Sequence, residues 1–541
     1  MAPLSVICLV LAGASQVASF SRFAPSLAPR LNANKPIDAF VDSLRLQKEQ
    51  VQVVHDYLVK DSNLDAYLEH RSYDSTQLAA TACGTLEILL GKDSVDTSPV
   101  NETVVQETWL SPNCASFPDA KADVSLIIKT VQFFGTQFVV RSGGHSPNPG
   151  FSSLAGPGLL IDLQRLNRIS LSRDGKTVAL EPGARWGAVY STLDPYNVSV
   201  IGARIPHVGV GGTFLGGGYF HFSGQYGTAA DNLKNVNIVL ANGSIIDANA
   251  KESTDLFWAL KGGGPNYGIV VEYVAYTTPV KDMWYQAGIY ASAQVPAILD
   301  AFAKWQNTGA ADLKSTVALI IGLQTTTLGF FYSEPASKPK AFELFYDIPS
   351  LAVAIPPTNG TVNSLTQVLG STFSNVPQRH DYRAASSKVD AQLYNDVYDF
   401  WRQEASAVHN TTGANMTFTL QPVPANLAQE GSRKGGNPMG VPTEAHQWWT
   451  TIVDWTHAKD DEIVRAVPIA TEKKWKELSE KRGLDVKYRF LNDASRDQNP
   501  LATYGTENLQ RLKQIAIKYD PGKVFQNLQN DGFLIYQQSI H

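Results

Sequence analysis

The sequence predicts an α+β protein in which a second unit is inserted into the first. At 541 residues the chain is longer than a usual single domain, so we expect two globular units or one interleaved pair. Between about residues 120 and 280, short β-branched runs alternate with glycines. From 281 to 485 glycine becomes sparse while strand-like runs persist, which indicates a separate α+β unit.

Residues 1–19 are predicted to be a secretory signal peptide. The stretch is apolar, most of all at residues 4–12, and it ends in the small residues Val17-Ala18-Ser19. A buried N-terminal helix is the alternative. No later segment reaches the roughly 18 consecutive apolar residues of a membrane span, so we expect a secreted chain that does not enter the membrane.

Composition excludes several classes of partner. The net charge is -5 and no basic run occurs, which argues against binding to nucleic acid or to an anionic membrane surface. Hydrophobic residues make up 43% of the chain and charged residues 18%, a balance typical of an ordered globular protein. No metal site is predicted.

The cysteines and sequons agree with export. Removal of Cys8 with the signal peptide leaves Cys83 and Cys114, an even pair suited to one disulfide in an oxidising compartment. Two free buried thiols are the alternative. Acceptor sequons for N-glycosylation occur at Asn101, Asn197, Asn242, Asn359, Asn410 and Asn415.

The first unit is expected to combine helices with short strands. Apolar spacing predicts a helix across 36–70 and a short helix at 84–91. Asn242-Gly243 indicates a hairpin turn because both residues tolerate positive φ. Thr254 is expected to cap a short helix through Trp258, which Gly262 ends. The β-branched runs predict strands at 137–142, 158–163, 176–181, 235–240 and 268–277.

Two glycine clusters carry the chemical signal of the chain. In Val139-Val-Arg-Ser-Gly-Gly-His-Ser146, a β-branched strand runs into two glycines and a histidine. Backbone N–H groups there can approach an anion while the imidazole projects beside it. The second cluster is Val208-Gly-Val-Gly-Gly-Thr-Phe-Leu-Gly-Gly-Gly218. A flexible loop is the alternative for the second cluster, and a satisfied core or surface residue is the alternative for the histidine.

The general glycine fingerprints do not fit these clusters. Gly209-Val-Gly211-Gly-Thr-Phe214 lacks the third glycine of a dinucleotide-binding fold. Gly175-Lys176-Thr177 has Ser170 where a phosphate loop needs its first glycine. Neither nucleotide-binding class is therefore predicted from these motifs.

The clusters instead resemble the flavin domain of the vanillyl-alcohol-oxidase superfamily, specifically its berberine-bridge-enzyme-like branch. Arg141-Ser-Gly-Gly-His145 is similar to that family's R-[SG]-G-G-H motif. The resemblance continues in order through Glu181-Pro-Gly-Ala-Arg-Trp186, Tyr226-Gly227, Asp231-Asn232, Leu240-Ala-Asn-Gly243, Asp255 to Val270, and Tyr519-Asp-Pro521 followed by Phe525-Gln526.

This resemblance implies a PCMH-type FAD-binding domain of two α/β subdomains with an inserted α+β substrate domain built on an antiparallel sheet. The FAD-binding domain is expected at 36–280 and the substrate domain at 281–485. Residues 486–541 are expected to return to the FAD-binding domain. In the substrate domain, strand-like runs occur at 319–323, 417–421 and 448–453.

FAD is the cofactor that the resemblance implies, bonded covalently to His145. Many members add a bond from a cysteine in a C-x-x-V-G-x-G-G pattern, but that position is Ile205 here, so a single linkage is expected. The residues expected to bind the cofactor are Arg141, Ser142, Gly143, Gly144, His145, Ser146, Val208, Gly209, Gly211, Gly212, Gly217, Gly218, Tyr219, Gly268, Ile269, Val270 and Asn508.

Two further positions bear on the reaction. Val208 falls where the family places a small residue that lets oxygen reach the flavin, and simple core packing is the alternative. Relatives often use the tyrosine of an Asn-Tyr pair as base, whereas this chain has Asn492-Asp493. Asp493 is the candidate base if burial raises its pKa, and a solvated turn residue is the alternative. His207 and His221 are reserve candidates.

The resemblance implies a secreted FAD-linked oxidase. It would transfer a hydride from a small organic substrate to FAD and return the electrons to O2 as H2O2, in the manner of fungal secondary-metabolite tailoring oxidases. A carbohydrate oxidase is the nearest rival, in which Trp448-Trp449 would line an open groove. Two functions without redox chemistry stay open as well, namely a flavin-holding cyclase and an inert secreted glycoprotein.

Overall fold

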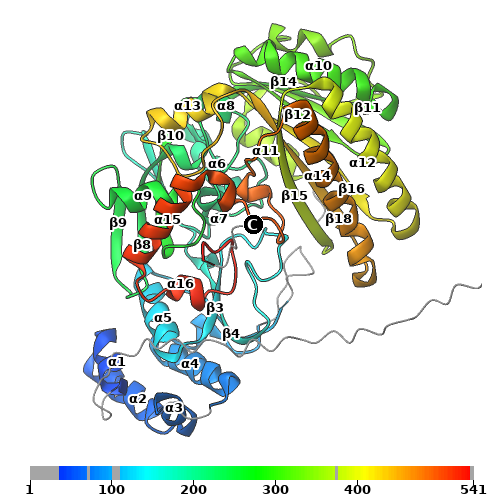
Figure 1. Cartoon of the computed structure of the whole chain (residues 1–541). Helices are drawn as coiled ribbons and strands as arrows, with labels where there is room; N and C mark the ends of the chain where they lie inside the picture. Colours follow the sequence, from blue (N-terminus) through cyan, green and yellow to red (C-terminus); the bar gives the residue numbers. More distant parts are fainter. Residues whose placement is uncertain (1–35, 70–72, 100–109, 372–375, 537–541) are drawn as a thin grey trace, which may run out of the picture.

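The computed structural model describes residues 36–69, 73–99, 110–371 and 376–536 of the chain (Figure 1). Three β-sheets organise these residues, and helices pack between and around them. The predicted signal peptide and the sequon at Asn101 lie outside the described residues. Among the residues described, no helix is both long and apolar enough to cross a membrane.

Five helices form the N-terminal layer and pack with the first sheet into one core. The predicted helix across 36–70 is instead three helices within 36–68, because Arg45 interrupts it at φ 56° and Asp61 caps a new start. The helices are α1 (Pro36–Leu44), α2 (Lys48–Leu58), α3 (Ser62–Leu68), α4 (Ser75–Leu90) and α5 (Lys121–Phe134).

The first sheet has the strand order β1-β2-β4-β3, with β2 and β3 both parallel to β4. Its strands are β1 (Val95–Asp96), β2 (Pro112–Ser116), β3 (Gln137–Arg141) and β4 (Gly156–Asp162). Cys83 of α4 and Cys114 of β2 form the predicted disulfide, with their Cα atoms 6.1 Å apart. The bond ties the helical layer to the sheet that carries the first glycine cluster.

The second sheet is antiparallel, in the order β5-β6-β10-β8-β9 with β7 paired to β10. The predicted turn at Asn242-Gly243 joins β8 to β9, and Gly243 has φ +78°. The strands are β5 (Ile169–Leu171), β6 (Thr177–Leu180), β7 (Ser199–Val200), β8 (Leu233–Val239), β9 (Ile245–Asn249) and β10 (Ile269–Thr278).

Four short helices accompany the second sheet. They are α6 (Trp186–Leu193), α7 (Val210–Leu215), α8 (Ser223–Tyr226) and α9 (Thr254–Leu260). The predicted cap of the last of these is wrong by one residue, since Ser253 occupies the N-cap of α9 and Thr254 is its first helical residue. The α7 helix consists of part of the second glycine cluster.

The third sheet has two differently covered faces. Its order is β14-β11-β13-β12-β17-β18-β15 with β16 paired to β18. Helices α10, α12 and α14 cover one face (Figure 1) and enclose a core of their own. Tyr285, Phe331 and Trp448 join the other face to the core of the second sheet. The sheet thus presents one face to the glycine clusters.

The strands of this sheet are β11 (Asp282–Ala291), β12 (Ser315–Ile321), β13 (Thr325–Tyr332), β14 (Ala352–Thr361), β15 (Arg379–Lys388), β16 (Asn415–Met416), β17 (Phe418–Val423) and β18 (His446–Trp455). Its helices are α10 (Val295–Asn307), α11 (Val362–Gly370), α12 (Ala391–Thr412), α13 (Ala425–Arg433) and α14 (Asp461–Arg482). The first strand of this sheet, β11, starts two residues after the predicted end of the first domain at residue 280.

The C-terminal segment runs back to the first two sheets. It contains α15 (Thr506–Tyr519), beside α9, and α16 (Val524–Asn527). Val524 and Phe525 of α16 belong to the core of the first sheet, and Leu512 and Ile515 of α15 to that of the second. Gln529 forms a bridge to Phe138 of β3. The C-terminal segment therefore pairs with β3, the strand that leads into the loop containing His145.

Loss of the disulfide should lower the free energy of unfolding by about 3 kcal/mol, because the bond closes a long loop in the unfolded chain. Cys83→Ala, Cys114→Ala and the double variant should lose similar amounts in urea unfolding, since each removes the same bond. A double variant that loses twice as much as either single variant would contradict this expectation.

Candidate active site

The two glycine clusters meet backbone to backbone. A Cβ atom on Gly143 would lie 2.6 Å from the Cα of Gly209, and a Cβ on Gly209 would lie 2.6 Å from the Cα of Gly143. Real Cβ atoms do not approach so closely, so both positions need glycine. The contact brings the loop after β3, from the first sheet, against the loop before α7, from the second.

Polar side chains fasten this contact from both sides. The Ser142 hydroxyl donates to the Pro182 carbonyl and accepts from the Gly211 N–H, at 3.2 Å. The Arg185 guanidinium donates to the carbonyl oxygens of Gly143 and His207. Arg141 pairs with Asp162 at the ends of neighbouring strands. Predicted cofactor residues thus build the junction itself.

The junction leaves backbone donors available for an anion. Within the described residues, the N–H groups of Gly143 and Gly144 have no acceptor. Gly144 has φ +61°, a conformation that lets consecutive N–H groups point into one concavity. A Cβ on Gly212 would meet nothing within 4 Å, so an open space lies beside it. These features fit the diphosphate and ring of FAD lying against the glycines.

His145 projects from this loop as a half-buried side chain. Burial, reinforced by the nearby Arg185 guanidinium, lowers the pKa of His145 to about 4. The imidazole is therefore neutral at neutral pH and keeps a lone pair on one ring nitrogen. A neutral ring nitrogen is what a bond to an electrophilic carbon requires.

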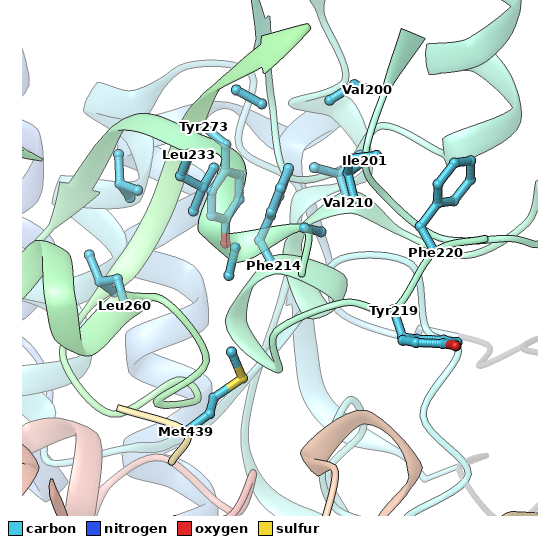
Figure 2. Packing of buried hydrophobic residues seen from close by; sticks show 14 of the residues in the cluster. Val200, Ile201, Val210, Phe214, Tyr219, Phe220, Leu233, Leu260, Tyr273 and Met439 are labelled. Atoms are coloured by element: carbon cyan, nitrogen blue, oxygen red, sulfur yellow. The ribbon is translucent and has the colours of Figure 1, made fainter. Parts of the chain in front are cut away.

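Asn492 fixes the second glycine cluster from the C-terminal segment. Its Nδ2 donates to the Gly212 carbonyl at 3.0 Å, and its Oδ1 accepts from the Gly218 N–H at 3.0 Å. Gly217 and Gly218 have φ of +107° and +73°, which favour glycine. Figure 2 shows the packing beneath: Phe214 lies beside Tyr273 and Val210 beside Ile201, whereas the Tyr219 ring lies apart from them.

Asp493, the predicted base, ends a row of three polar side chains. Its Oδ2 accepts from Gln421 Nε2 at 2.6 Å, and Gln421 Oε1 accepts from Arg204 Nη2 at 2.6 Å. Burial raises the pKa of Asp493, while Arg204 and the Gln421 hydrogen bond act in the opposite direction. Asp493 is therefore half-buried and hydrogen-bonded, and its pKa is shifted in the direction that its predicted role needs.

The row joins three parts of the chain, and the sequence did not reveal it. Arg204 lies just before the second glycine cluster, Gln421 on β17 and Asp493 in the C-terminal segment. The sequence singles out Arg204 only through its neighbour Ile205, which occupies the cysteine position of the family motif. Gln421 lies in an ordinary strand pattern, and no spacing rule connects it to residue 493.

The face of the third sheet near this row has further polar groups. His380 and Asp454 are hydrogen-bonded cross-strand partners on β15 and β18. Tyr382, two residues further along β15, lies in the field of Asp454 and Asp493. Burial raises the pKa of the Tyr382 phenol, and the two carboxylates raise it further, so the phenol keeps its proton at neutral pH.

An ionic network centred on the buried Arg383 holds the segment that contains Asp493. Arg383 of β15 pairs with Glu472 of α14 and with Asp497. Ser495 donates to Asp381 at 2.9 Å, and the Gln498 side chain forms two hydrogen bonds with the backbone of Ala384. These contacts fix the segment on the third sheet and so set the position of the carboxyl group.

The remaining predicted residues differ in what they contact. Gly268, Ile269 and Val270 lie in the core at the start of β10. The Asn508 amide donates to the carbonyls of Pro438 and Tyr504. Ser146 accepts from the backbone N–H of Asn148. Their cofactor contacts stay predictions.

The reserve histidines are placed unequally. His207 is exposed beside the junction. His221 is buried, with its ring centroid 4.4 Å from that of Phe331, and burial lowers its pKa to about 3. His221 is thus enclosed by aromatic side chains, while His207 can be reached from solvent.

The suggestion that Trp448 and Trp449 line an open groove is wrong. Their exposed fractions are 1% and 0%, and they lie on opposite faces of β18. Trp448 stacks on Phe490 in the core of the second sheet, and Trp449 packs in the core under the helices. Neither ring is available to a sugar, so the feature that favoured a carbohydrate substrate is lost.

The comparisons with known proteins agree with this site. A family profile described as an FAD binding domain matches residues 112–249. The chain is 37% identical over 458 residues to an FAD-dependent monooxygenase of Arthrobotrys oligospora, covering 84% of this chain and 89% of that protein. It is 32% identical over 432 residues to the bifunctional solanapyrone synthase of Alternaria solani, covering 78% and 81%.

Solved structures share the fold. Glucooligosaccharide oxidase of Acremonium strictum superposes with a TM-score of 0.69 at 19% identity, covering 82% of this chain and 97% of that one. Berberine bridge enzyme of Eschscholzia californica gives a TM-score of 0.64 at 20% identity, covering 77% and 89%.

Fold and site together define an FAD-linked oxidoreductase with a PCMH-type flavin domain. The chain belongs to the vanillyl-alcohol-oxidase superfamily of FAD-linked oxidoreductases.

The glycine junction can be tested with a matched pair of substitutions. Gly209→Ala should lower both the melting temperature and the FAD content, because its Cβ would overlap Gly143 and repacking costs about 1–3 kcal/mol. Gly212→Ala should keep the melting temperature of the apoprotein, since its Cβ meets no protein atom, yet lower the FAD content. Equal destabilisation of the apoprotein by both variants would contradict this assignment.

Proposed function

We propose that the protein is a secreted FAD-linked oxidase acting on a small secondary metabolite. The observation that carries the proposal is the meeting of the His145 loop and the second glycine cluster at one junction, with the half-buried carboxyl group of Asp493 next to Asn492, which binds that cluster. When bound, FAD supplies a two-electron acceptor for a hydride. The substrate loses one hydride and one proton, and O2 leaves with the same electrons and protons as H2O2.

Asp493 is proposed to take the proton of the substrate. A carboxylate accepts a proton best when its pKa lies near the working pH, and burial shifts Asp493 in that direction. Gln421 holds Oδ2 in place from β17, which leaves Oδ1 for the substrate. The Tyr219 hydroxyl donates to the Pro422 carbonyl at 2.6 Å, which fixes the position of the Tyr219 ring.

His145 is proposed to hold FAD by the only covalent bond. Ile205 stands at the position where a second linkage would need a thiol. Cys83 and Cys114 are engaged with each other in α4 and β2. Within the described residues, no free thiol is therefore offered to the cofactor.

Val208 is proposed to leave a path for O2. It is half-buried at the junction, and its carbonyl accepts from the Trp186 N–H at 3.1 Å, which fixes the backbone at this position. Relatives are named monooxygenases, a reaction that would place one oxygen atom in the product. Release of H2O2 against incorporation of 18O from 18O2 separates the two outcomes.

A cyclase role is the second candidate. One relative is named a bifunctional solanapyrone synthase, a name that joins two activities in one protein. If this chain also guides a cyclisation, the oxidised product released from the site should cyclise faster in the presence of the protein than in buffer.

The single covalent linkage predicts a clear biochemical result. Acid precipitation of the wild-type protein should leave the yellow flavin on the peptide containing residues 141–146. The His145→Ala variant should release all of its flavin into the supernatant, because no second bond exists. His207→Ala is the matched control and should keep the flavin bound. Flavin on any cysteine-containing peptide would overturn the single linkage.

The oxidase reaction predicts a base with a raised pKa. In anaerobic stopped-flow with a substrate that bleaches the flavin, the rate should fall as the pH drops through the raised pKa of Asp493, because only the ionised carboxyl accepts a proton. Asp493→Asn should slow bleaching by about 10²–10⁴-fold and remove this pH dependence.

Asp399→Asn, at an exposed position on α12, is the control and should behave as wild type. Admission of air should restore the yellow colour with one H2O2 per turnover. Bleaching of the Asp493→Asn variant at the wild-type rate would exclude Asp493 as the base, and absence of H2O2 would exclude the oxidase.

A further inference from the structure

Arg204 is a charged side chain that takes no part in the proposed proton transfer. It is half-buried, and its guanidinium lies 5.2 Å from the centroid of the Tyr219 ring. Its Nη2 donates to Gln421 Oε1 at 2.6 Å. In the part of the chain that the structure describes, the guanidinium thus contacts a neutral amide and an aromatic face, not a carboxylate.

The geometry leaves most of the guanidinium unused. Arginine has five N–H donors, of which the described residues engage the one toward Gln421. None of the Arg204 nitrogens is among the fully buried side-chain atoms that lack a partner, so its other donors are not sealed inside the core. A fixed guanidinium with free donors at the edge of an aromatic face is the arrangement that proteins use for planar oxyanions.

The charges around Arg204 favour an anionic ligand. The positive charge of Arg204 acts on Tyr219, His221, Tyr382 and Asp493, which places it among the groups of the proposed active site. Arg185 adds a second cation at the junction. Asp454 is engaged with His380 and Asp493 with Gln421. A negatively charged ligand would therefore meet a guanidinium that no carboxylate of the described residues contacts directly.

We propose that Arg204 binds an oxyanion of the substrate, so that the natural substrate is an enol, a phenol or a carboxylic acid ionised near its reacting carbon. That the bound oxyanion belongs to the substrate rests on the proposed function, whereas the oxyanion-binding site at Arg204 does not. An oxyanion held on Arg204 also brings the reacting carbon next to Asp493, because Gln421 links the two side chains directly.

The orientation of Gln421 gives the site a built-in coupling. Its oxygen must face Arg204, which only donates, and its amide nitrogen must face Asp493, which accepts. An anion on Arg204 cancels the positive charge that lowers the pKa of Asp493. Substrate binding then raises the pKa of this carboxyl further and strengthens it as a base.

The test is ligand binding to the oxidised holoenzyme, in which FAD already fills the backbone cradle. Calorimetric titration would compare benzoate, 4-cyanophenolate and the enolate of 1,3-cyclohexanedione with neutral benzamide. At least one of the three oxyanions should bind about 10-fold or more tightly than benzamide, and the tightest one identifies the source of the charge.

Substitutions assign the binding to Arg204. Arg204→Met should weaken the preferred oxyanion by about 10- to 100-fold and leave benzamide within a few-fold. Arg204→Lys should keep part of the preference, since it keeps the charge and loses the planar fork. Arg173→Met, at an exposed turn in the flavin domain, is the matched control and should bind as wild type.

The outcomes separate this proposal from the oxidase proposal, because the titration needs no turnover. Absence of charge preference in the wild type, or a preference that survives Arg204→Met, overturns the oxyanion site even if H2O2 is produced. A preference lost in Arg204→Met supports the site even if no H2O2 appears. If Arg204→Met does not fold, the oxyanion preference is measured at low and at high salt in the wild type and in Arg204→Lys. A preference that weakens with salt and is reduced in Arg204→Lys supports the site, and a preference that neither salt nor Arg204→Lys changes overturns it.

Discussion

The contact between Gly143 and Gly209 is the constraint on which the site depends. Two loops from two different sheets approach more closely than any Cβ permits, so the position of His145 relative to the second cluster is set by backbone alone. Ser142 and Arg185 then hold both loops through backbone carbonyls and N–H groups. A cofactor that lies along this junction meets main-chain donors whose places do not depend on rotamers.

The third sheet completes the site because one of its faces packs under the helices and the other faces the flavin domain. On β17, Leu420 packs under the helices while its neighbour Gln421 faces the flavin domain. On β18, Trp449 and Trp448 divide in the same way. The alternation of a strand thus gives one face a rigid core and leaves the other for chemistry. The ionic network around Arg383, on the helix-covered side of β15, then fixes the segment that contains Asp493 to this sheet.

Local signals predicted the parts of the fold that local physics decides. The strands at 137–142 and 235–240, the Asn242-Gly243 turn and the Cys83–Cys114 pair follow from residue type and order, and the structure contains them. The long N-terminal helix was wrong because apolar spacing does not register a positive φ at Arg45. Trp448-Trp449 misled for a similar reason, since neighbours on a strand face opposite sides.

The polar row was beyond the sequence because it exists only in the folded chain. Arg204, Gln421 and Asp493 are separated by hundreds of residues in total, and each is ordinary in its own segment. Together they satisfy one another: a carboxyl buried without Gln421 would lack its hydrogen bond, and Gln421 without Arg204 would leave an oxygen unpaired. These hydrogen bonds allow an aspartate to occupy position 493 with its carboxyl group paired. The burial that raises its pKa is opposed by the charge of Arg204, two hydrogen bonds away, and by the hydrogen bond from Gln421.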